Sequence, residues 1–470
     1  MKKSYKITFF YLVSFLITIY LFLAFGEKLK RDNEALKYLK SLFSYEQKQT
    51  IKKYFFPYKY SSELNTLVKT YQKQIAFFED EIYPQLVKLE LSYNDSLDKL
   101  KITRSKIKLS NNQILNKYKI EDGFVAGIHN LFPGSGYIDF YENRILVLSS
   151  RGILTYTDDI DENHYLKIIK TNINEYINIK QFEKKSWFSL KDLFIQDNKI
   201  FISYTEEIEE NCWNTSVIYG DINLESIKFK KLFSANECVH SIKNIDNQFN
   251  ALQSGGKIIL FDDKNILLSI GDYRSRFLAQ DRQSVNGKII KINIESGNYK
   301  IISMGHRNPQ GLYYDEKHGI IIEAEHGPMG GDEINLISVN KIKNNEILNY
   351  GWPVSSYGEH YGGKKAKKNI KDYEKYPLYK SHSEHGFIEP LKSFVPSIGI
   401  MSVVKVGEKK YVIGSAKTKA LYFFELNEQN KIVNINKIEV YERVRDIKLK
   451  KNKLYLFLEN TASIGVINLN

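Results

Sequence analysis

The sequence predicts an all-β fold, a six-bladed β-propeller that follows an N-terminal helical part. Glycine is absent from Glu27 to Glu121 and returns at short intervals from Gly123 onward. From there to the C-terminus, short β-branched and aromatic runs alternate with Asp, Asn and Gly, which is the pattern of antiparallel strands and their turns. About 350 residues of this kind suit six four-stranded blades of about 60 residues each. A pair of stacked β-sandwiches is the alternative.

Eight runs show the strand pattern most clearly, and turn residues bound them. They are Ile145 to Ser149, Ile200 to Tyr204, Ile258 to Phe261, Ile266 to Ile270, Gly319 to Ala324, Lys410 to Gly414, Leu421 to Leu426 and Lys453 to Leu458. Two of these runs adjoin an Asn-Lys turn, at Asn198-Lys199 and at Asn452-Lys453. We expect a hairpin at each of these turns.

The positive charge of the chain is concentrated near the N-terminus. The 470 residues carry a formal charge of +13, and 43% of them are apolar, enough to bury a large core. Residues 1–120 hold 22 Lys and Arg against 11 Asp and Glu, whereas the rest of the chain holds 46 against 44. The basic excess therefore fits a membrane surface better than a nucleic acid, and we expect no nucleic-acid partner.

The segment from Ile7 to Gly26 contains no charged residue and follows three lysines. Its twenty residues are long enough to span a bilayer core. We expect residues 1–26 to be a retained anchor that leaves the rest of the chain on the periplasmic side of the inner membrane. The alternative is a cleaved signal peptide, for which Ala24-Phe25-Gly26 offers a cleavage site, and the protein would then be secreted.

Residues 27–120 are predicted to form a helical arm in front of the propeller domain, residues 121–470. Apolar residues recur in the arm at spacings of three and four, as on one face of a helix. They are Leu64, Leu67, Tyr71, Ile75, Phe78 and Ile82. Pro84 then interrupts or kinks the helix.

Cys212 and Cys238 are the two cysteines of the chain, and neither belongs to a CxxC motif. In an exported protein, such a pair on strands can form one disulfide. Two buried free thiols are the alternative. We expect no metal site from these two residues alone.

The stretch from Gly305 to Pro353 packs glycine, proline, charge and amide into tight turns between apolar runs. This composition is expected where backbone and side chains converge on a small polar ligand. Its motifs are Gly305-His306-Arg307-Asn308-Pro309-Gln310-Gly311, Glu325-His326-Gly327-Pro328, Gly330-Gly331-Asp332-Glu333-Ile334-Asn335 and Asn349-Tyr350-Gly351-Trp352-Pro353. The stretch is therefore the first candidate for a functional site.

These motifs resemble those of the soluble glucose dehydrogenase and sorbosone dehydrogenase family, the pyrroloquinoline quinone (PQQ) dependent aldose sugar dehydrogenases. The resemblance covers roughly residues 123–470 and implies a six-bladed propeller with the cofactor site at its mouth. Further matching segments are Gln253-Ser254-Gly255-Gly256-Lys257, Ser269-Ile270-Gly271-Asp272, Gln280-Asp281, Asn286-Gly287-Lys288-Ile289, Pro396-Ser397, Gly414-Ser415-Ala416-Lys417 and Arg443-Val444-Arg445-Asp446. Each is weak alone, whereas so many in the family's order form a strong signal.

The resemblance implies six cofactor-binding residues: Arg307, Asn308, His326, Lys417, Arg443 and Arg445. PQQ is a flat ortho-quinone with carboxylate groups, so its site requires several cations with good hydrogen-bond geometry. For Arg443 and Arg445, which share one strand face at i and i+2, an ordinary solvated surface is the alternative.

The family also implies a Ca²⁺ ion that is bound by backbone carbonyl oxygens of the Gly-Pro turn, here Gly327 and Pro328. A hard cation suits such oxygens, and in the family it polarises the quinone carbonyl toward hydride. We expect Asp332 to support this turn from behind. Asp332 and Glu333 would equally serve to hold turns by binding backbone amides.

One position departs from the family. Its His-x-Gly-Gly segment begins with the general base that takes the proton from the anomeric hydroxyl of the sugar, and this chain has Gln253 there. An amide has no useful basicity, so a contribution of about 10² to 10⁴ in rate would be missing. Asp272 is a candidate to orient a water or to replace the base.

Two functions from different classes follow from these residues. The first is a PQQ- and Ca²⁺-dependent oxidation of an aldose sugar outside the cytoplasm, in which electrons pass to an external acceptor. The cations at Lys417, Arg443 and Arg445 favour it, and we expect this function. The second is a catalytically inactive propeller that acts as a binding or scaffold module, which Gln253 favours. Hydrolysis of the kind found in lactonase propellers would need an inward set of carboxylates that is not obvious here.

Overall fold

The structure is a computed structural model that describes residues 98–120, 135–150, 152–177, 190–364, 366 and 369–469. Nearer the N-terminus it describes residues 57–82, residue 85 and a few positions between 43 and 54. The chain divides into two compact units, Met1–Glu79 and Asp80–Asn470. The expected anchor, residues 1–26, lies outside the described residues, and none of the described helices is long and apolar enough to cross a membrane.

Helix α4 (Pro57–Phe77) belongs to the first unit, and a short π-helix, η1 (Phe78–Ile82), follows it. Pro57 stands at the first helical position, where its missing N–H costs no hydrogen bond. The apolar spacing therefore predicted this helix correctly. Its stripe is exposed, with Tyr71 and Ile75 keeping 55% and 56% of their surface accessible. Pro84 lies outside the described residues.

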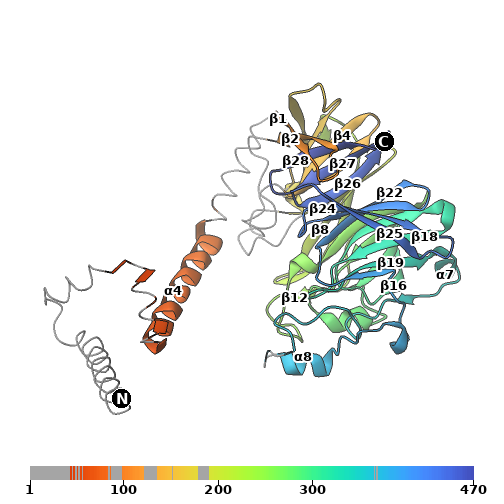
Figure 1. Ribbon diagram of the computed structural model, residues 1–470. Coiled ribbons are helices and arrows are strands. Elements are labelled where there is room, and N and C mark those ends of the chain that lie inside the picture. Colours follow the sequence, from red (N-terminus) through yellow and green to blue (C-terminus); the bar gives the residue numbers. More distant parts are fainter. Residues whose placement is uncertain are drawn as a thin grey trace, which may run out of the picture. The chain divides into compact units, whose positions relative to one another are not determined.

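The second unit contains six groups of four strands, which we number as blades in chain order (Figure 1). Blade 1 contains β3 (Gly136–Tyr141), β4 (Arg144–Ser149), β5 (Leu154–Thr157) and β6 (Tyr165–Thr171). Blade 2 contains β7 (Leu190–Gln196), β8 (Lys199–Glu209), β9 (Cys212–Asp221) and β11 (Lys230–Phe233). Blade 3 contains β13 (Gly255–Asp262), β14 (Asn265–Ile270), β15 (Lys288–Asn293) and β16 (Tyr299–Met304).

The remaining three blades complete the unit. Blade 4 contains β17 (Pro309–Asp315), β18 (Ile320–Glu325), β19 (Asp332–Ser338) and β21 (Lys392–Phe394). Blade 5 contains β22 (Ile400–Gly407), β23 (Lys410–Ser415), β24 (Ala420–Leu426) and β25 (Ile432–Glu439). Blade 6 contains β26 (Val444–Lys450), β27 (Lys453–Leu458), β28 (Ser463–Asn468) and β2 (Ile114–Ile120).

Short elements lie at the blade edges and in the connections. The strands are β10 (Ser226–Ile227), β12 (Val239–His240) and β20 (Leu348–Asn349), which pair with β6, β9 and β16. The helical turns are η2 (Ile173–Glu175), η3 (Ala251–Gln253), η4 (Arg276–Gln280), η5 (Glu316–His318), α7 (Val339–Lys343), α8 (Ile370–Lys375) and η7 (Ser383–His385).

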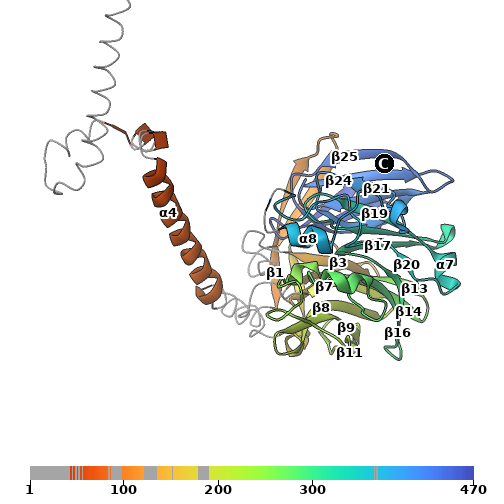
Figure 2. The ribbon, with the colours of Figure 1, turned by 90° about the horizontal axis from the view of Figure 1, so that it is seen from below.

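The blades form a closed ring. Their first strands, β3, β7, β13, β17, β22 and β26, contact one another in this order, and β26 contacts β3 again. Figure 2 labels β3, β7, β13 and β17 of this ring. This arrangement confirms the predicted all-β propeller and excludes the pair of sandwiches. Each of the eight predicted strand runs falls on a strand, and both Asn-Lys turns join hairpins, β7 to β8 and β26 to β27.

Residues 99–120 are part of the propeller, so the helical arm predicted over residues 27–120 was wrong in this stretch. Strand β1 (Lys99–Lys108) pairs with β2 of blade 6 and with β6 of blade 1. Leu100 and Ile102 are buried, whereas the lysines between and beside them are exposed. That alternation has the period of a strand, and the high lysine content concealed it. The N-terminal strands thus lie beside the C-terminal strands β27 and β28 (Figure 1).

Each pair of neighbouring blades has its own buried apolar cluster. Leu148 of blade 1 and Leu193 of blade 2 belong to one such cluster, and Ile322 of blade 4 and Ile413 of blade 5 belong to another. Corresponding clusters lie between the other neighbouring blades. Alternate residues of each strand face these clusters, as the two-residue period of a strand requires. The polar loops lie where the strands end, at the ends of the blades.

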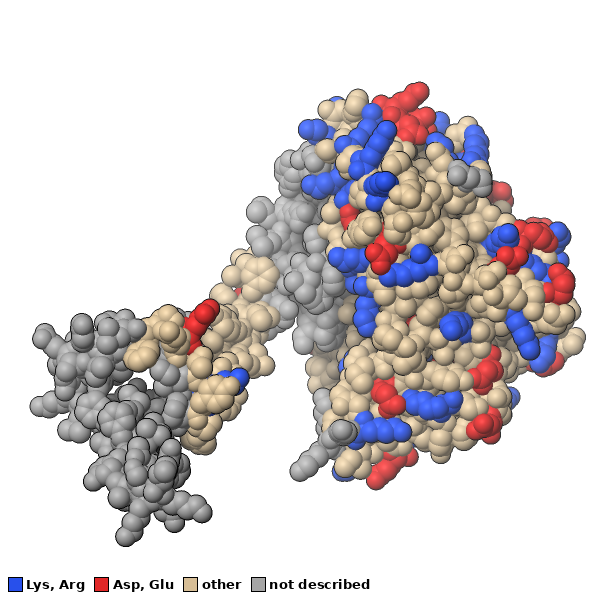
Figure 3. All heavy atoms as spheres, viewed as in Figure 1, with Lys and Arg blue, Asp and Glu red and all other residues tan. Residues whose placement is uncertain are grey.

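Cys212 at the start of β9 forms a disulfide with Cys238, which precedes β12. Of the two alternatives for the cysteines, the structure therefore has the disulfide. On the surface of the propeller seen in Figure 3, Lys and Arg are interspersed with Asp and Glu. This distribution agrees with the small net charge of the chain beyond residue 120.

A buried lysine joins three blades at the propeller axis. Lys257 of β13 donates to Asp192 of β7 at 2.9 Å and to Asp446 of β26 at 3.1 Å. The two aspartates are fully buried, and they also accept the backbone N–H groups of Ile258 and Ile138. Both carboxylates raise the pKa of Lys257 against the opposing effect of its burial, so the lysine stays charged.

We expect Lys257→Met to destabilise the propeller by about 3 to 5 kcal/mol, because it leaves two buried aspartates without their cation. The free energy of unfolding from denaturant titration measures the effect. Lys199→Met is the matched control, since Lys199 forms an exposed pair with Asp221 and should contribute about 1 kcal/mol or less. Equal losses in the two variants would contradict the importance of the axial lysine.

Candidate functional site

The predicted site residues lie on connections at the ends of the inner strands. Gln253 ends the turn η3 before β13, Asp272 follows β14, and Arg307 and Asn308 directly precede β17. Gly271 makes the close approach of the first two segments possible. A Cβ atom at Gly271 would lie 2.1 Å from the backbone oxygen of Gln253. The glycine of the Gly-Asp motif is therefore required by the turn that carries Gln253.

Gln253 is buried, and both ends of its amide are hydrogen-bonded to neighbouring side chains. With its amide oriented to match its neighbours, the nitrogen donates to Asp272 Oδ1 at 3.0 Å. The oxygen accepts from Arg307 Nη2 at 2.9 Å and from Arg274 Nε at 3.0 Å. An amide carries a donor nitrogen and an acceptor oxygen on one planar group. The nitrogen suits the acid on one side, and the oxygen suits the two cations on the other. Glutamine thus fits this position by its own chemistry.

Asp272 anchors the site from inside. Its Oδ2 accepts from Trp352 Nε1 at 2.8 Å, and its Oδ1 accepts from the backbone N–H of Arg274 at 2.9 Å. The side chain is fully buried, and burial raises the pKa of its carboxyl above the ordinary value. Because its oxygens are occupied by donors, the geometry favours a positioning role for Asp272 over direct proton transfer.

Arg307 and Asn308 tie neighbouring loops together. Arg307 Nη1 donates to the backbone oxygen of His326 at 2.9 Å. Asn308 Oδ1 accepts from the backbone N–H of Gly255 at 3.1 Å and from Gln310 at 2.9 Å. The two side chains therefore connect the segment of Gln253 with the Glu-His-Gly-Pro turn, as members of one site would.

A small pocket opens beside Gln253. It is lined by Gln253, Arg274, Arg276, Arg307, Pro328, Trp352, His360 and Tyr361. The guanidinium of Arg307 lies over the ring of Trp352 at 5.5 Å, and that of Arg274 lies over the ring of Tyr361 at 5.3 Å. Cations and aromatic faces together suit a flat anionic ligand.

Arg274 and Arg276 are site residues that the sequence analysis missed. Arg276 Nη1 is buried without a hydrogen-bond partner, and it lies 3.8 Å from the carboxylate of Asp246, too far for a hydrogen bond. A buried, unpaired guanidinium N–H at a pocket fits an acceptor of a ligand such as a carboxylate. Two arginines directly after the Gly-Asp motif were a signal available in the sequence.

The turn that contains Gly327 and Pro328 is held from behind by Asp332, as expected. Asp332 Oδ1 accepts from the backbone N–H of Gly327 at 3.2 Å, and Oδ2 accepts from Gly399 at 2.7 Å. A Cβ atom at Gly327 would lie 2.0 Å from the backbone oxygen of Gly331, so only glycine fits. The Pro328 carbonyl oxygen, one of the two expected Ca²⁺ ligands, lies 3.4 Å from the hydroxyl of Ser397.

The predicted cations on blades 5 and 6 are partly neutralised. Glu459, which is 1% exposed, accepts from Arg443 Nε at 2.8 Å and also pairs with Arg445. This carboxylate was not recognised from the sequence. It accounts for the two arginines as members of an internal ion-pair group, so that no ligand is required to explain them. Lys417 is exposed at the end of β23, and its backbone N–H donates to Ile398.

His326 lies within electrostatic reach of this group. Burial lowers the pKa of its imidazole, and the positive charges of Arg307, Arg445 and Arg443 lower it further against the opposite effect of Asp332. The ring is therefore neutral at pH 7, with one donor and one acceptor nitrogen available. The structure thus brings Gln253, Asp272, Arg307, Asn308 and His326 into one connected site, and charge links that site to blades 5 and 6.

Comparison with known proteins decides the family. A sequence model of the family described as Glucose / Sorbosone dehydrogenase matches residues 188–466, more than half of the chain. The chain belongs to this family. This confirms the resemblance that its motifs suggested.

The chain is similar to an uncharacterized protein of Synechocystis, with 29% identity over 41% of this chain and 50% of that protein. It is similar to the aldose sugar dehydrogenase YliI of Escherichia coli, with 26% identity over 58% of this chain and 72% of that one. The chain thus spans half of the first relative's length. The PQQ-bound aldose sugar dehydrogenase structure from Streptomyces coelicolor shares the fold, at 17% identity and TM-score 0.51 over 75% of this chain and 98% of that one.

Next to the site, His382 connects β19 of blade 4 with the segment that follows β20. Its Nδ1 lies 2.8 Å from the backbone oxygen of Tyr350, and its Nε2 lies 3.3 Å from Glu333 Oε1. Burial disfavours the charged ring, but the hydrogen bond and negative charge of Glu333 outweigh it and raise the pKa of His382. This contribution to stability is complete below about pH 6.5, the unfolded-state pKa, and is lost as pH rises through the higher folded-state pKa.

We therefore expect the stability difference between the wild type and His382→Gln to be largest near pH 6 and to shrink as pH rises. Urea denaturation over a pH series measures it. His385→Gln is the control, because His385 is exposed three residues away and should leave the pH dependence unchanged. A difference that does not vary with pH would contradict a charged His382.

Proposed function

We propose that this chain binds PQQ in the pocket beside Gln253 and oxidises an aldose sugar. The buried, unpaired Nη1 of Arg276 carries this proposal, because it offers a donor to an anionic ligand in a pocket that Arg274 and Arg307 also line. Family membership and the aldose sugar dehydrogenase activity of YliI support the reaction class. Quinone chemistry of this kind takes hydride from the anomeric carbon of the sugar.

The residues of the chain would divide the work as follows. Arg274, Arg276 and Arg307 bind carboxylates of the cofactor, and the aromatic faces of Trp352 and Tyr361 exclude water around it. Asn308, His326, Lys417, Arg443 and Arg445 complete the cofactor site in the proposal. The carbonyl oxygens of Gly327 and Pro328 hold a Ca²⁺ ion, which polarises the quinone carbonyl when bound.

Gln253 orients the sugar hydroxyl through the amide N–H that does not donate to Asp272, but it takes no proton, since an amide is not basic. Asp272 fixes the amide through the hydrogen bond to its nitrogen. Proton removal is therefore left to water. The reaction should be about 10² to 10⁴ slower than with a histidine base.

The proposed location is outside the cytoplasm, on the periplasmic side of the inner membrane, with electrons passing to an external acceptor. The Cys212–Cys238 disulfide supports an oxidising compartment. Residues 1–26 serve as the membrane anchor in this proposal.

A second candidate function is binding of the cofactor or a related anion without turnover, as a scaffold module. The hydrogen bonds of Gln253 favour it, because the amide nitrogen and oxygen already serve three protein neighbours. Glu459 favours it as well, since it explains Arg443 and Arg445 as an internal ion-pair group.

We expect Gln253→His to raise the rate of aldose oxidation by about 10² to 10⁴, with PQQ affinity changed only a few-fold. PQQ binding is measured by titration of the full-length protein with Ca²⁺ present, and turnover by reduction of a dye with a panel of aldoses.

Arg276→Met should weaken PQQ binding, whereas Arg282→Met, which removes an exposed arginine, is its matched control.

The outcomes separate the two candidates. Binding with slow turnover that the histidine variant accelerates supports the dehydrogenase. Binding without turnover in either protein supports the scaffold module. Absence of PQQ binding to the wild type sinks both the cofactor assignment and the proposed oxidation.

A further inference from the structure

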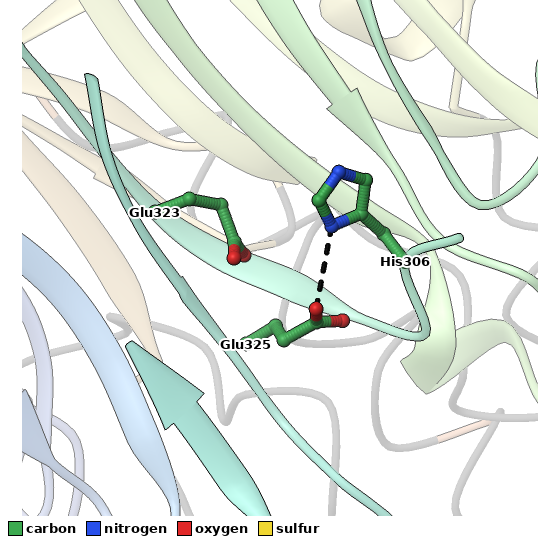
Figure 4. Close-up of side chains that lie close together, drawn as sticks. All are labelled: His306, Glu323 and Glu325. Carbon is green, nitrogen blue, oxygen red and sulfur yellow. Dashed lines mark hydrogen bonds and ion pairs between the residues drawn. The ribbon is translucent and has the colours of Figure 1, made fainter. Parts of the chain in front are cut away.

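A buried group of acids lies behind the pocket, on blade 4. Glu323 and Glu325 are two residues apart on β18, so their side chains share one face. On the neighbouring strand β19, Asn335 stands opposite Glu323 and Glu333 stands opposite Glu325. His306 reaches the same place from the connection before β17, and its ring and both carboxylates point toward one another (Figure 4).

The group has the spacing of a metal site. One potential ligand atom each from His306, Glu323 and Glu325 lies within 4.8 Å of the other two. His306 Nδ1 is 3.3 Å from Glu325 Oε1. The three residues are 0%, 0% and 3% exposed. A single cation among them would therefore be shielded from water.

The two carboxylates lack a protein cation. Within the described part of the chain, neither Glu323 nor Glu325 forms an ion pair with a lysine or an arginine. Glu323 Oε1 is buried without any hydrogen-bond partner, and so is Asn335 Oδ1. A buried acceptor without a donor costs about 1 to 3 kcal/mol, more if it is charged. These oxygens point to a missing positive group.

The hydrogen bonds around the ring are those of a metal ligand. His306 Nε2 lies 2.9 Å from Ser303 Oγ, which fixes the ring. When Nε2–H donates to this hydroxyl, the lone pair of Nδ1 faces the two carboxylates, an arrangement that a cation between them stabilises. Asn335 Nδ2 donates to Glu323 Oε2 at 3.0 Å and to Glu325 Oε1 at 3.1 Å, and so orients both acids.

We propose that His306, Glu323 and Glu325 form a buried structural site for one divalent transition cation of the Zn²⁺ or Mn²⁺ class. An imidazole nitrogen with two carboxylate oxygens suits these ions better than Ca²⁺, which prefers six or more oxygens. Asn335 contributes by orienting the two carboxylates through its Nδ2 and is not itself a ligand. The site is separate from the Gly327-Pro328 turn and does not depend on the proposed function.

Such an ion would stiffen the base of the pocket. Glu325 Oε2 accepts from the backbone N–H of Arg307 at 2.7 Å, so the acid that binds the cation also holds the arginine that lines the pocket. The ring of His306 packs on Tyr350 at 4.9 Å, next to Trp352 in the sequence. The cation would thus fix the two segments that carry Arg307 and Trp352.

The test is the metal content of the full-length protein, produced in medium with Zn²⁺ and Mn²⁺ and dialysed against metal-free buffer without chelator, which removes loosely bound ions. We expect about one equivalent of Zn²⁺ or Mn²⁺ by elemental analysis. Glu323→Gln should lower it by about tenfold or more. Glu442→Gln is the matched control, because Glu442 is also a buried carboxylate but pairs with Lys117 of blade 6.

A second measurement does not depend on the variant. The wild type is unfolded with a chelator and refolded with or without Zn²⁺ or Mn²⁺ alone, and we expect the ion to raise the midpoint of thermal unfolding by several degrees. A metal-free wild type, Ca²⁺ as its sole ion, or equal content in Glu323→Gln would overturn the proposal. If the wild type is metal-free and refolds to the same midpoint without added ion, a proton shared within this group of side chains takes the place of the cation.

Discussion

The structure depends on the buried charge of Lys257 at the propeller axis. Apolar clusters hold neighbouring blades together, but burial of apolar surface is non-directional and tolerates small shifts between sheets. The bonds from Lys257 to Asp192 and Asp446 do not tolerate such shifts, since an unpaired buried charge is costly. They fix three inner strands relative to one another. Because β13 begins at Gly255, two residues after Gln253, the same bonds position the candidate site.

Charge compensation decides what the site offers to a ligand. The sequence suggested that Arg443 and Arg445 are cations available to a ligand, whereas in the fold both pair with Glu459. At the pocket, positive charge without an acidic ion-pair partner among the described residues lies on the side of Arg274 and Arg307, against aromatic rings, whereas Arg276 pairs with Asp246. An anion would therefore be attracted mainly to that side. The amide of Gln253 lies at the edge of this part of the pocket, where it is hydrogen-bonded to Arg274, Arg307 and Asp272. It forms part of the pocket wall without adding charge.

The sequence predicted features that local pattern or motif order carries. Strand alternation located the blades, and the Arg307-Asn308 and Glu325-His326-Gly327-Pro328 motifs met in space as expected. The sequence did not reveal contacts between residues that are distant along the chain. Glu459 follows β27 and has no motif of its own, and Asp192 is one of many aspartates at strand ends. The strand β1 was missed for another reason, since its high lysine content concealed a buried alternation that is limited to Leu100 and Ile102.

The pairing of β2 with β28 makes the first strand group and the last one interdependent. During synthesis, β2 emerges long before β28, so its outer hydrogen-bonding edge stays unpaired while about 340 further residues are added. Exposed strand edges promote association between chains. Lys117 and Lys119 stand at alternate positions of β2, and their like charges keep such edges apart until the ring closes. A fragment limited to residues 188–466 would lack β1, β2 and all of blade 1, and would leave the ring open.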